Sequence, residues 1–344
     1  MFQTKYSVSP KLLSNIKRIA VLLNEFEHKK FADVVLMEFE KAAESLSSFA
    51  STSIEGNPLP LTEVKRVLKA KPKSIRDSER EVLNYNKALQ ELNRFLKKNK
   101  LTFSLDLILK IHHQVMAGLL DKFRCGKFRK EPVFVRDPRT GKDIFFPPDH
   151  GDVPKLMREL VSYIKKQQGK IDPLLLAGIF HKQFVLIHPF VDGNGRVARL
   201  ATKAILADMG IDTFYLFSFE NYYNRSVTQY FQMVGEKGDY YDIEGEVDFT
   251  EWLEYFTDGI IDELLRVQKE IEKISRTPDQ ALKEYHKVIL THIEKHGFIT
   301  DADYAKLTNR AKATRSLDFK KLIELELIQR EGKGKGTYYK LKKS

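Results

Sequence analysis

Apolar residues recur at helical spacing through the first hundred residues of the chain. Four segments follow this pattern and are predicted to be helices: 9–29, 31–55, 61–70 and 77–99. Ser9, just ahead of Pro10, is expected to cap the first helix, and Thr62 is expected to cap the third. Gly56 and the two prolines that follow it form a strong stop signal for the second helix.

The helical pattern continues to residue 210 with one interruption. Four more helices are predicted there, over residues 101–119, 152–167, 172–190 and 196–210. The segment 172–190 is apolar on nearly every side, so we expect it to be the buried central helix. In the interruption, residues 131–148, two short runs typical of β-strands flank a turn near Pro138–Gly141, which predicts a hairpin.

The last part of the chain has a different order of elements. Three helical segments precede a glycine-rich basic hairpin: the helices are 281–297, 300–309 and 311–328, and the hairpin is 329–343. This order resembles a winged-helix domain, in which Thr300 would cap the second helix and the third would be the recognition helix. The basic side chains of that helix are Lys312, Arg315, Lys320 and Lys321. The wing, Lys333 to Gly336, could contact phosphates.

Two functions are open for this C-terminal module. DNA binding is one, because residues 276–344 hold 16 Lys and Arg against 9 Asp and Glu, which is most of the net charge of +11. Protein interaction or homodimerisation is the other, with the lysines as a solvated face. Asp318, Glu324 and Glu326 interrupt the basic surface, and no aromatic residue that would read DNA is evident.

The composition is that of an ordinary globular protein. The 344 residues are 42% hydrophobic and 31% charged, and leave room for two or three domains. A single cysteine, Cys125, excludes an intramolecular disulfide and a cysteine-based zinc site. No run approaches the ~18–20 apolar residues of a membrane span, and the start lacks the apolar core of a secretory signal. A cytoplasmic protein without a membrane partner is therefore expected.

The segment "HPFVDGNGRVAR" lies between two predicted helices, at the N-terminus of the second. A helix N-terminus binds anions through free backbone N–H groups and the positive end of the helix dipole. Gly193 and Gly195 would let the backbone approach an anion closely, and Asn194 can donate its side-chain amide. Arg196 and Arg199, three residues apart, can both reach the same polyanion. This half of the motif predicts a phosphate site.

A carboxylate and a histidine complete the motif. Asp192 beside phosphates indicates a Mg²⁺ ligand, because Mg²⁺ takes one or two carboxylates together with phosphate oxygens and water. His188 ends the buried helix and is within reach as a general base. The motif is not a Walker P-loop, because no Gly-Lys-Ser/Thr follows and the loop joins two helices. Together these parts describe deprotonation of a nucleophile next to a Mg²⁺-bound nucleotide.

Simpler interpretations fit single residues but not the whole set. A His–Pro pair at a helix end is usually structural, and a Gly-Asn-Gly turn is usually only a turn. His188 and Asp192 could instead bind a transition metal, but His181 is seven residues away and no third ligand is evident. The coincidence of all the polar and glycine positions in one register favours the nucleotide site.

The segment resembles the signature of the Fic family, His-x-Phe-x-Asp/Glu-Gly-Asn-Gly-Arg-x-x-Arg, at every fixed position. The similarity extends through "KIHHQVMAGL", "GKFRKEPVFV" and "FPPDHGDVPKLM" and covers roughly residues 105–260. It implies an all-helical core with a β-hairpin flap, and transfer of AMP from ATP to a protein hydroxyl.

The resemblance also implies roles for individual residues. His188 would deprotonate the Ser, Thr or Tyr hydroxyl of the target, and Asp192 would hold Mg²⁺ between the α- and β-phosphates. Arg196 would bind the α/β-phosphate region and Arg199 the γ-phosphate. Gly195 favours AMP transfer, because the relatives that phosphorylate have Lys there. The residues that would cradle the phosphates are Gly193, Asn194 and Gly195.

Positions outside the phosphate site follow from the same resemblance. Phe190 would anchor the loop in the core. Ile144 and Phe145 of the flap would align the target segment by β-augmentation. Tyr230 would lie near the nucleotide base, and an ordinary place in the core is the alternative for this residue.

The segment "STSIEGN" ends the second predicted helix. Glu55 is unfavourable there, because a helix C-terminus carries partial negative charge that only a nearby cation would compensate. Beside the Fic signature the segment resembles the inhibitory motif of the family, Ser/Thr-x-x-x-Glu-Gly/Asn. Glu55 would then pair with Arg199 and remove the γ-phosphate ligand, while Ser51 would fix the helix.

These patterns predict a mainly α-helical protein with a Fic-type core, a flap and a C-terminal winged helix. The predicted parts are an N-terminal helical region 1–104 with an inhibitory helix at about 39–56, a Fic core 105–260, a helical linker 261–279 and a winged-helix domain 280–344. The first hypothesis is an autoinhibited, Mg²⁺-dependent adenylyltransferase that modifies a protein hydroxyl, including its own. The alternatives are a transcription regulator whose core only senses nucleotide, and de-AMPylation or UMP transfer on the same core.

Overall fold

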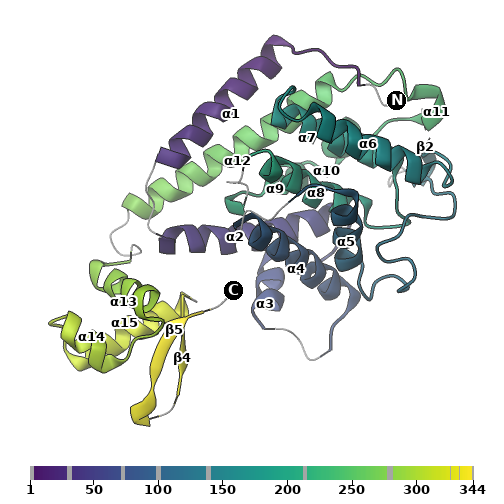
Figure 1. Ribbon diagram of the computed structural model, residues 1–344. Coiled ribbons are helices and arrows are strands. Elements are labelled where there is room, and N and C mark those ends of the chain that lie inside the picture. The colour runs from purple at the N-terminus through teal and green to yellow at the C-terminus, as the bar shows by residue number, and fades with distance from the viewer. Residues whose placement is uncertain are drawn as a thin grey trace. The chain divides into compact units, whose positions relative to one another are not determined.

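The chain forms two compact units (Figure 1). The computed structural model describes residues 4–28, 33–70, 74–97, 102–136, 141–211, 215–276, 282–325, 327–332 and 334–342. The larger unit comprises residues 1–31 and 39–267, and the smaller comprises residues 32–38 and 268–344. The four-part division expected from the sequence stays a prediction.

The chain is mainly helical, as predicted, and its strands are few and short. As far as Arg276 the elements are α1 Pro10–His28, α2 Asp33–Ile54, α3 Leu61–Lys69, α4 Asp77–Lys97, α5 Leu105–Val115, β1 Val135–Arg136, β2 Asp143–Phe146, α6 Val153–Gln167, α7 Pro173–Ile187, α8 Asn194–Asp208, α9 Phe219–Arg225, α10 Val227–Val234, β3 Gly238–Asp239, α11 Tyr240–Ile243 and α12 Thr250–Arg276. No helix in the described segments has the length and apolar content to cross a membrane.

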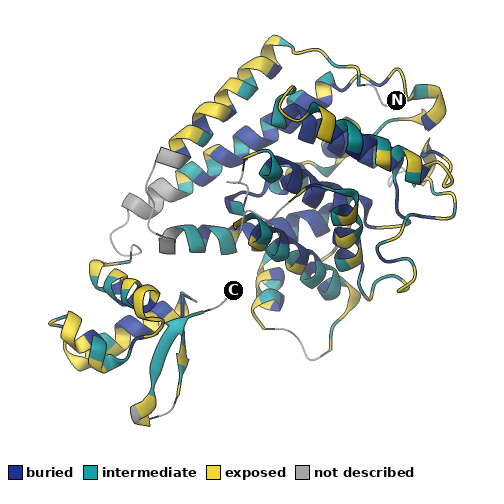
Figure 2. Cartoon of the chain, viewed as in Figure 1, coloured by how far each residue is buried: buried dark blue, intermediate teal, exposed yellow. Residues whose placement is uncertain are grey.

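Helix α7 is the buried central helix of the larger unit, as its sequence predicts (Figure 2). It packs against α6, α8 and α10. Gly178, in the middle of α7, allows close approach of α12, because a Cβ there would lie 2.6 Å from Leu253 Cδ2. The indole N–H of Trp252 donates to the Gly178 carbonyl at 2.8 Å, so α12 is also held by a buried hydrogen bond.

The predicted hairpin is present and belongs to a three-stranded sheet. β1 and β2 are antiparallel, and β2 also pairs in parallel with β3, so the strand order is β1-β2-β3. Most of the predicted turn, residues 137–140, lies outside the described residues. The third strand, β3, was not expected from the sequence, because a strand of two residues is too short to show an alternation of apolar and polar positions.

Of the three helix ends predicted from single residues before residue 70, two are confirmed and one is wrong. Ser9 Oγ accepts the Leu12 N–H at 3.1 Å and caps α1, and Gly56 has a φ of 92° just after α2. Thr62 does not cap α3, because that helix begins at Leu61 and its N-cap is Pro60. The fixed φ of proline suits this position, so the helix starts directly after it.

The smaller unit contains α13 Glu284–His296, α14 Asp301–Leu307, α15 Lys312–Glu324, β4 Ile328–Glu331 and β5 Tyr338–Leu341. Three helices followed by an antiparallel hairpin is the expected order, and Thr300 caps α14 in a capping box with Asp303. Phe319 stacks on Tyr339 with centroids 4.0 Å apart, which ties α15 to the hairpin. The assignment of a winged-helix domain stays a prediction.

Candidate active site

The loop 188–193 joins α7 to α8 and carries much of the predicted site. His188 has a φ of 49° and Gly193 a φ of 83°, so both ends of the loop are left-handed. That conformation is costly for a histidine and persists only where its surroundings enforce it. The Asn194 side chain accepts the Phe190 N–H at 2.9 Å and donates to the Phe190 carbonyl at 2.8 Å. Asn194 thus shapes the loop, and Phe190 is its buried anchor.

Arg129, a buried residue that sequence reasoning missed, holds the same loop. Its Nε donates to the His188 carbonyl at 2.9 Å, and its backbone N–H donates to the Pro189 carbonyl at 3.0 Å. Burial lowers the pKa of Arg129, although a guanidinium remains a cation at neutral pH. These bonds support the left-handed backbone of His188.

His112 on α5 is a second support that the motif does not contain. Its ring stacks on Phe190 with centroids 3.7 Å apart. Nδ1 accepts the Gly126 N–H at 2.8 Å, so the proton of the neutral ring is on Nε2, which donates to the Asp192 carbonyl at 3.1 Å. Burial lowers the pKa of His112 to about 4, so the ring is neutral near pH 7.

His188 has the tautomer that a general base requires. Its Nδ1 lies 3.1 Å from the Val185 carbonyl oxygen, which can only accept a hydrogen bond. Nδ1 therefore carries the proton, and the lone pair of the neutral ring is on Nε2. Burial lowers the pKa of His188, which keeps the ring unprotonated at neutral pH.

Arg199 is fully buried and is bound by the end of α2. Its Nη2 donates to Glu55 Oε1 at 2.6 Å and to the Ser51 carbonyl at 2.9 Å, and its Nε donates to Ser51 Oγ at 2.8 Å. Burial alone would lower the pKa of Arg199, but the Glu55 carboxylate, together with Tyr230 and Tyr85, outweighs this and raises it. The pair also explains the carboxylate at a helix C-terminus, because the guanidinium compensates it.

Gly195 lies directly against the same carboxylate. A Cβ at this position would collide with Glu55 Oε1 and would lie 3.0 Å from Arg199 Nη1. Any larger residue at 195 would therefore push Glu55 out of its place. Gly195, Arg199 and Glu55 form one close-packed arrangement at the start of α8.

Arg196 is held by two carboxylates. Its Nη2 donates to Asp192 Oδ1 at 2.9 Å, and its Nη1 donates to Glu81 Oε1 at 2.6 Å. The other oxygen of Glu81 accepts from the Asn57 side chain at 2.6 Å. Glu81, on α4, is a further site residue that sequence reasoning missed. It connects Arg196 to the segment that follows the predicted inhibitory helix.

Glu81→Ala is expected to lower the free energy of unfolding by about 3 kcal/mol, because it leaves the buried Arg196 guanidinium without one of its partners. The matched control is Glu63→Ala, which breaks an exposed pair with Arg66 and should cost less than about 1 kcal/mol. Denaturant unfolding of both variants measures the difference. Equal losses would show that Glu81 does not stabilise the buried Arg196 guanidinium.

Tyr230 does not lie where the resemblance predicts, and the core alternative fits it better. It is 1% exposed and stacks on Tyr223 with centroids 4.6 Å apart. Its hydroxyl oxygen lies 3.4 Å from Arg199 Nη1 and 3.0 Å from His181 Nε2. A side chain packed on all sides offers no face for a nucleotide base, so Tyr230 supports the position of Arg199 instead.

His181 is expected to make the protein less stable in acid. Burial places its folded pKa well below the ordinary value of about 6.5. Its contribution to stability is therefore fully present above pH 6.5 and is lost as the pH falls below that value. Thermal unfolding at pH 7.5 and 5.5 should show a larger loss in the wild type than in His181→Gln, which does not titrate. Equal losses would exclude His181 as the cause.

Ile144 and Phe145 lie on β2, the middle strand of the small sheet. Phe145 is paired with Val135 of β1 on one side and with Gly238 of β3 on the other. A target segment could pair directly with β2 only if one of these strands moved aside. The outer edge of the sheet at β1 is the simpler place for an added strand.

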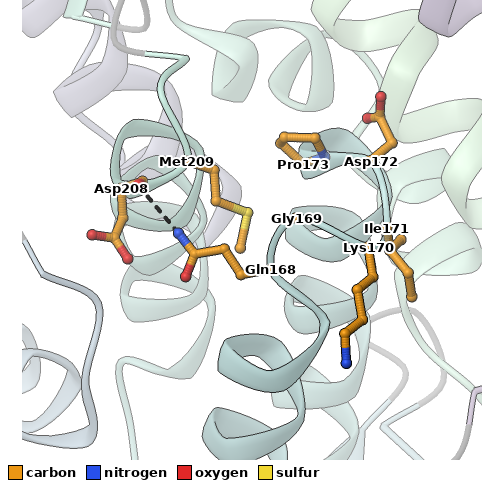
Figure 3. A pocket seen from close by; sticks show the side chains of 8 residues that line it. All are labelled: Gln168, Gly169, Lys170, Ile171, Asp172, Pro173, Asp208 and Met209. Atoms are coloured by element: carbon orange, nitrogen blue, oxygen red, sulfur yellow. Dashed lines mark hydrogen bonds between the residues drawn. The ribbon is translucent and has the colours of Figure 1, made fainter.

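A surface hollow of about 600 Å³ lies away from this site (Figure 3). Its lining residues are Gln168, Gly169, Lys170, Ile171, Asp172, Pro173, Asp208 and Met209. They lie in the connection from α6 to α7, at the start of α7 and at the end of α8, whereas the motif joins the opposite ends of α7 and α8. A helix of this length spans about 22 Å, so the hollow is separate from the predicted chemistry.

The region that carries these residues is similar to known proteins. Residues 102–206 match the sequence model of the Fic/DOC family. "Protein adenylyltransferase Fic" of Aedes aegypti is 30% identical over 218 residues, which cover 58% of this chain and 42% of that protein. The protein of the same name from Drosophila mojavensis is 34% identical over 184 residues, which cover 52% and 35%. The chain thus matches less than half the length of these relatives.

A solved structure resembles the chain over nearly its whole length. This Fic family protein from Desulfovibrio desulfuricans has a TM-score of 0.65 and 20% identity, and the likeness covers 99% of this chain and 98% of that one. At this level of identity the likeness concerns the fold. The mainly helical fold class is confirmed.

Proposed function

We propose that this chain, which carries a Fic domain, transfers AMP from ATP to a hydroxyl group of a protein, and that Glu55 restrains the reaction. The names of the relatives support the activity. The single observation that carries the proposal is the contact between His188 Nδ1 and the Val185 carbonyl oxygen, because it leaves an unprotonated Nε2 in the loop that leads to two arginines at the start of α8. A protein that only senses nucleotide would not need such a base.

The proposed reaction is an in-line displacement at the α-phosphorus. His188 Nε2 takes the proton of the target hydroxyl, and the hydroxyl oxygen forms a bond to the α-phosphorus. At the same time the bond between the α-phosphorus and the pyrophosphate oxygen breaks. Arg196, Arg199 and the backbone N–H groups at the start of α8 stabilise the negative charge on the phosphate oxygens. The products are a protein that carries AMP and free pyrophosphate.

Asp192 fits the role of a Mg²⁺ ligand. Its side chain is 55% exposed, and Oδ1 is the oxygen that accepts from Arg196 and from the Gly193 N–H. Mg²⁺ at nucleotide sites takes one or two carboxylates and completes its shell with phosphate oxygens and water, and a single accessible carboxylate suits that need. The metal would neutralise phosphate charge.

The contact between Glu55 and Arg199 supports a restrained enzyme. While Glu55 accepts from Arg199 Nη2, that N–H group cannot be directed at a phosphate. The carboxylate also fills the space against Gly195, the centre of the proposed phosphate cradle. Ser51 binds the same guanidinium at two atoms and holds α2 in this position.

Label transfer tests the proposed activity. The full chain is incubated with Mg²⁺ and ATP labelled at either the α- or the γ-phosphate, and self-labelling is measured for the wild type and for Glu55→Gly. We expect label from the α-phosphate and none from the γ-phosphate. Label from the γ-phosphate alone would indicate phosphorylation, and no label from either with ATP binding intact would favour a nucleotide sensor. Labelled UTP, tested in parallel, shows whether the chain transfers UMP instead of AMP.

A further inference from the structure

The contact between Glu55 and Arg199 is one end of a longer row of contacts between α2 and α8. One turn after Arg199 on α8, the Lys203 ammonium donates to Ser47 Oγ at 3.0 Å. Ser47 in turn stands one turn ahead of Ser51 on α2, so the contacts run in opposite directions along the two helices. Two such contacts fix the register of α2 against α8, because a shift of one turn would break both.

The Ser47 hydroxyl is held from two sides by a buried ion pair. It donates to Glu220 Oε2 at 3.2 Å, and the Lys203 ammonium lies 3.0 Å from Glu220 Oε1. The Lys203 side chain is 5% exposed and the Glu220 side chain is fully buried. Buried charged groups lose free energy when a hydrogen-bonding partner is removed, because water does not replace it. The pair therefore keeps Ser47, and with it α2, in one position.

The other buried side chains of α2 are mostly small or polar. Between Phe39 and Ile54 the buried residues are Ala43, Glu44, Ser47, Ser48, Ala50, Ser51 and Thr52. Alanine, serine and threonine bury little apolar area, and hydrophobic stabilisation is roughly proportional to that area. The Glu44 carboxylate accepts from the side-chain amides of Gln90 and Asn93 at 2.9 and 3.2 Å. Polar contacts thus largely decide where this part of α2 lies.

We infer that Ser47 is a positioning residue of the restraint, held by the Lys203–Glu220 pair so that α2 brings Glu55 to Arg199. This inference rests on the proposed function, because it names what keeps Glu55 in its inhibitory place. Ser47 stands eight positions before Glu55 in the chain. A change at Ser47 should therefore relieve the restraint although Glu55 and Arg199 are both present.

The test uses Ser47→Ala, which removes the hydroxyl but leaves Lys203 and Glu220 paired with each other. Initial rates of self-labelling are measured on the full chain with Mg²⁺ and ATP labelled at the α-phosphate. With Glu55 present, Ser47→Ala should raise the rate about three- to tenfold, the factor that corresponds to one hydrogen bond. In the Glu55→Gly background the same change should alter the rate by less than about twofold, because the group that it positions is already absent.

A second measurement does not depend on the transfer reaction. Exchange of the backbone amide hydrogens of residues 45–55 should be about three- to tenfold faster in Ser47→Ala than in the wild type. Ser45→Ala is the matched control, because the Ser45 hydroxyl donates to the Lys41 carbonyl of its own helix at 3.0 Å. This control should change neither the exchange nor the rate.

The outcomes separate the inference from the proposed function. If Glu55→Gly is faster than the wild type but Ser47→Ala is not, or if exchange in Ser47→Ala is unchanged, the inference is wrong and the proposed function stands. Equal changes of rate in the two backgrounds would indicate a general effect on the fold and would also overturn it. If Glu55→Gly itself labels no faster than the wild type, the proposed restraint fails and the inference fails with it.

Discussion

The Glu55→Gly variant is expected to label itself from the α-phosphate of ATP about ten to a hundred times faster than the wild type. The Glu55–Arg199 contact is a charge-assisted hydrogen bond of 2.6 Å to a buried guanidinium. Hydrogen bonds to charged groups contribute about 1.5–3 kcal/mol, and each 1.4 kcal/mol corresponds to a factor of ten. Removal of the carboxylate frees Arg199 to bind phosphate, and the rate of label transfer should therefore rise by about that factor.

The measurement compares initial rates of self-labelling at one Mg²⁺ and ATP concentration. Glu63→Gly is the matched control, because it removes a nearby glutamate that pairs with the exposed Arg66 and does not contact the site. Ser51 still binds Arg199 in the Glu55→Gly variant, so α2 should stay in place. An unchanged rate in Glu55→Gly, with ATP binding intact, would show that Glu55 is not a brake.

The helices of this fold follow from sequence periodicity, whereas their ends depend on single residues. The apolar pattern identified α7 as the central helix, because burial on every face leaves no polar stripe. Residues 311–328 were predicted to be one helix, but α15 ends at Glu324 and Ile328 already begins β4. Leucine and isoleucine suit a buried strand as well as a helix, so the pattern alone does not place that end.

The site was predictable where its residues stand together in one motif, and at Glu55, which a second motif marks. The motif indicated His188 and the two arginines, and the structure brings Glu55 to Arg199 across 144 positions of the chain. Glu81 is 115 residues from its partner Arg196, and a lone glutamate on an amphipathic helix gives no sign of such a pairing. Arg129 and His112 were missed for the same reason, since each acts on backbone atoms of a distant loop.

The second large effect concerns His188. His188→Ala in the Glu55→Gly background is expected to reduce label transfer at least a hundredfold while ATP still binds. A positioned general base typically contributes about 10²–10⁴ to the rate, and the His188 ring has its lone pair on Nε2 because Nδ1 is used by the Val185 carbonyl. His113→Ala is the control, since His113 is an exposed histidine on α5.

The pH dependence of Glu55→Gly distinguishes a base from a residue that only shapes the loop. Burial lowers the pKa of His188, so the ring is already unprotonated at pH 7. The rate should therefore be flat above pH 7 and fall only below the ordinary histidine value of about 6.5. A structural role would lower ATP binding in His188→Ala and leave the pH profile of the residual activity unchanged. If His188→Ala keeps both the rate and this profile, another group accepts the proton and the proposed mechanism is wrong.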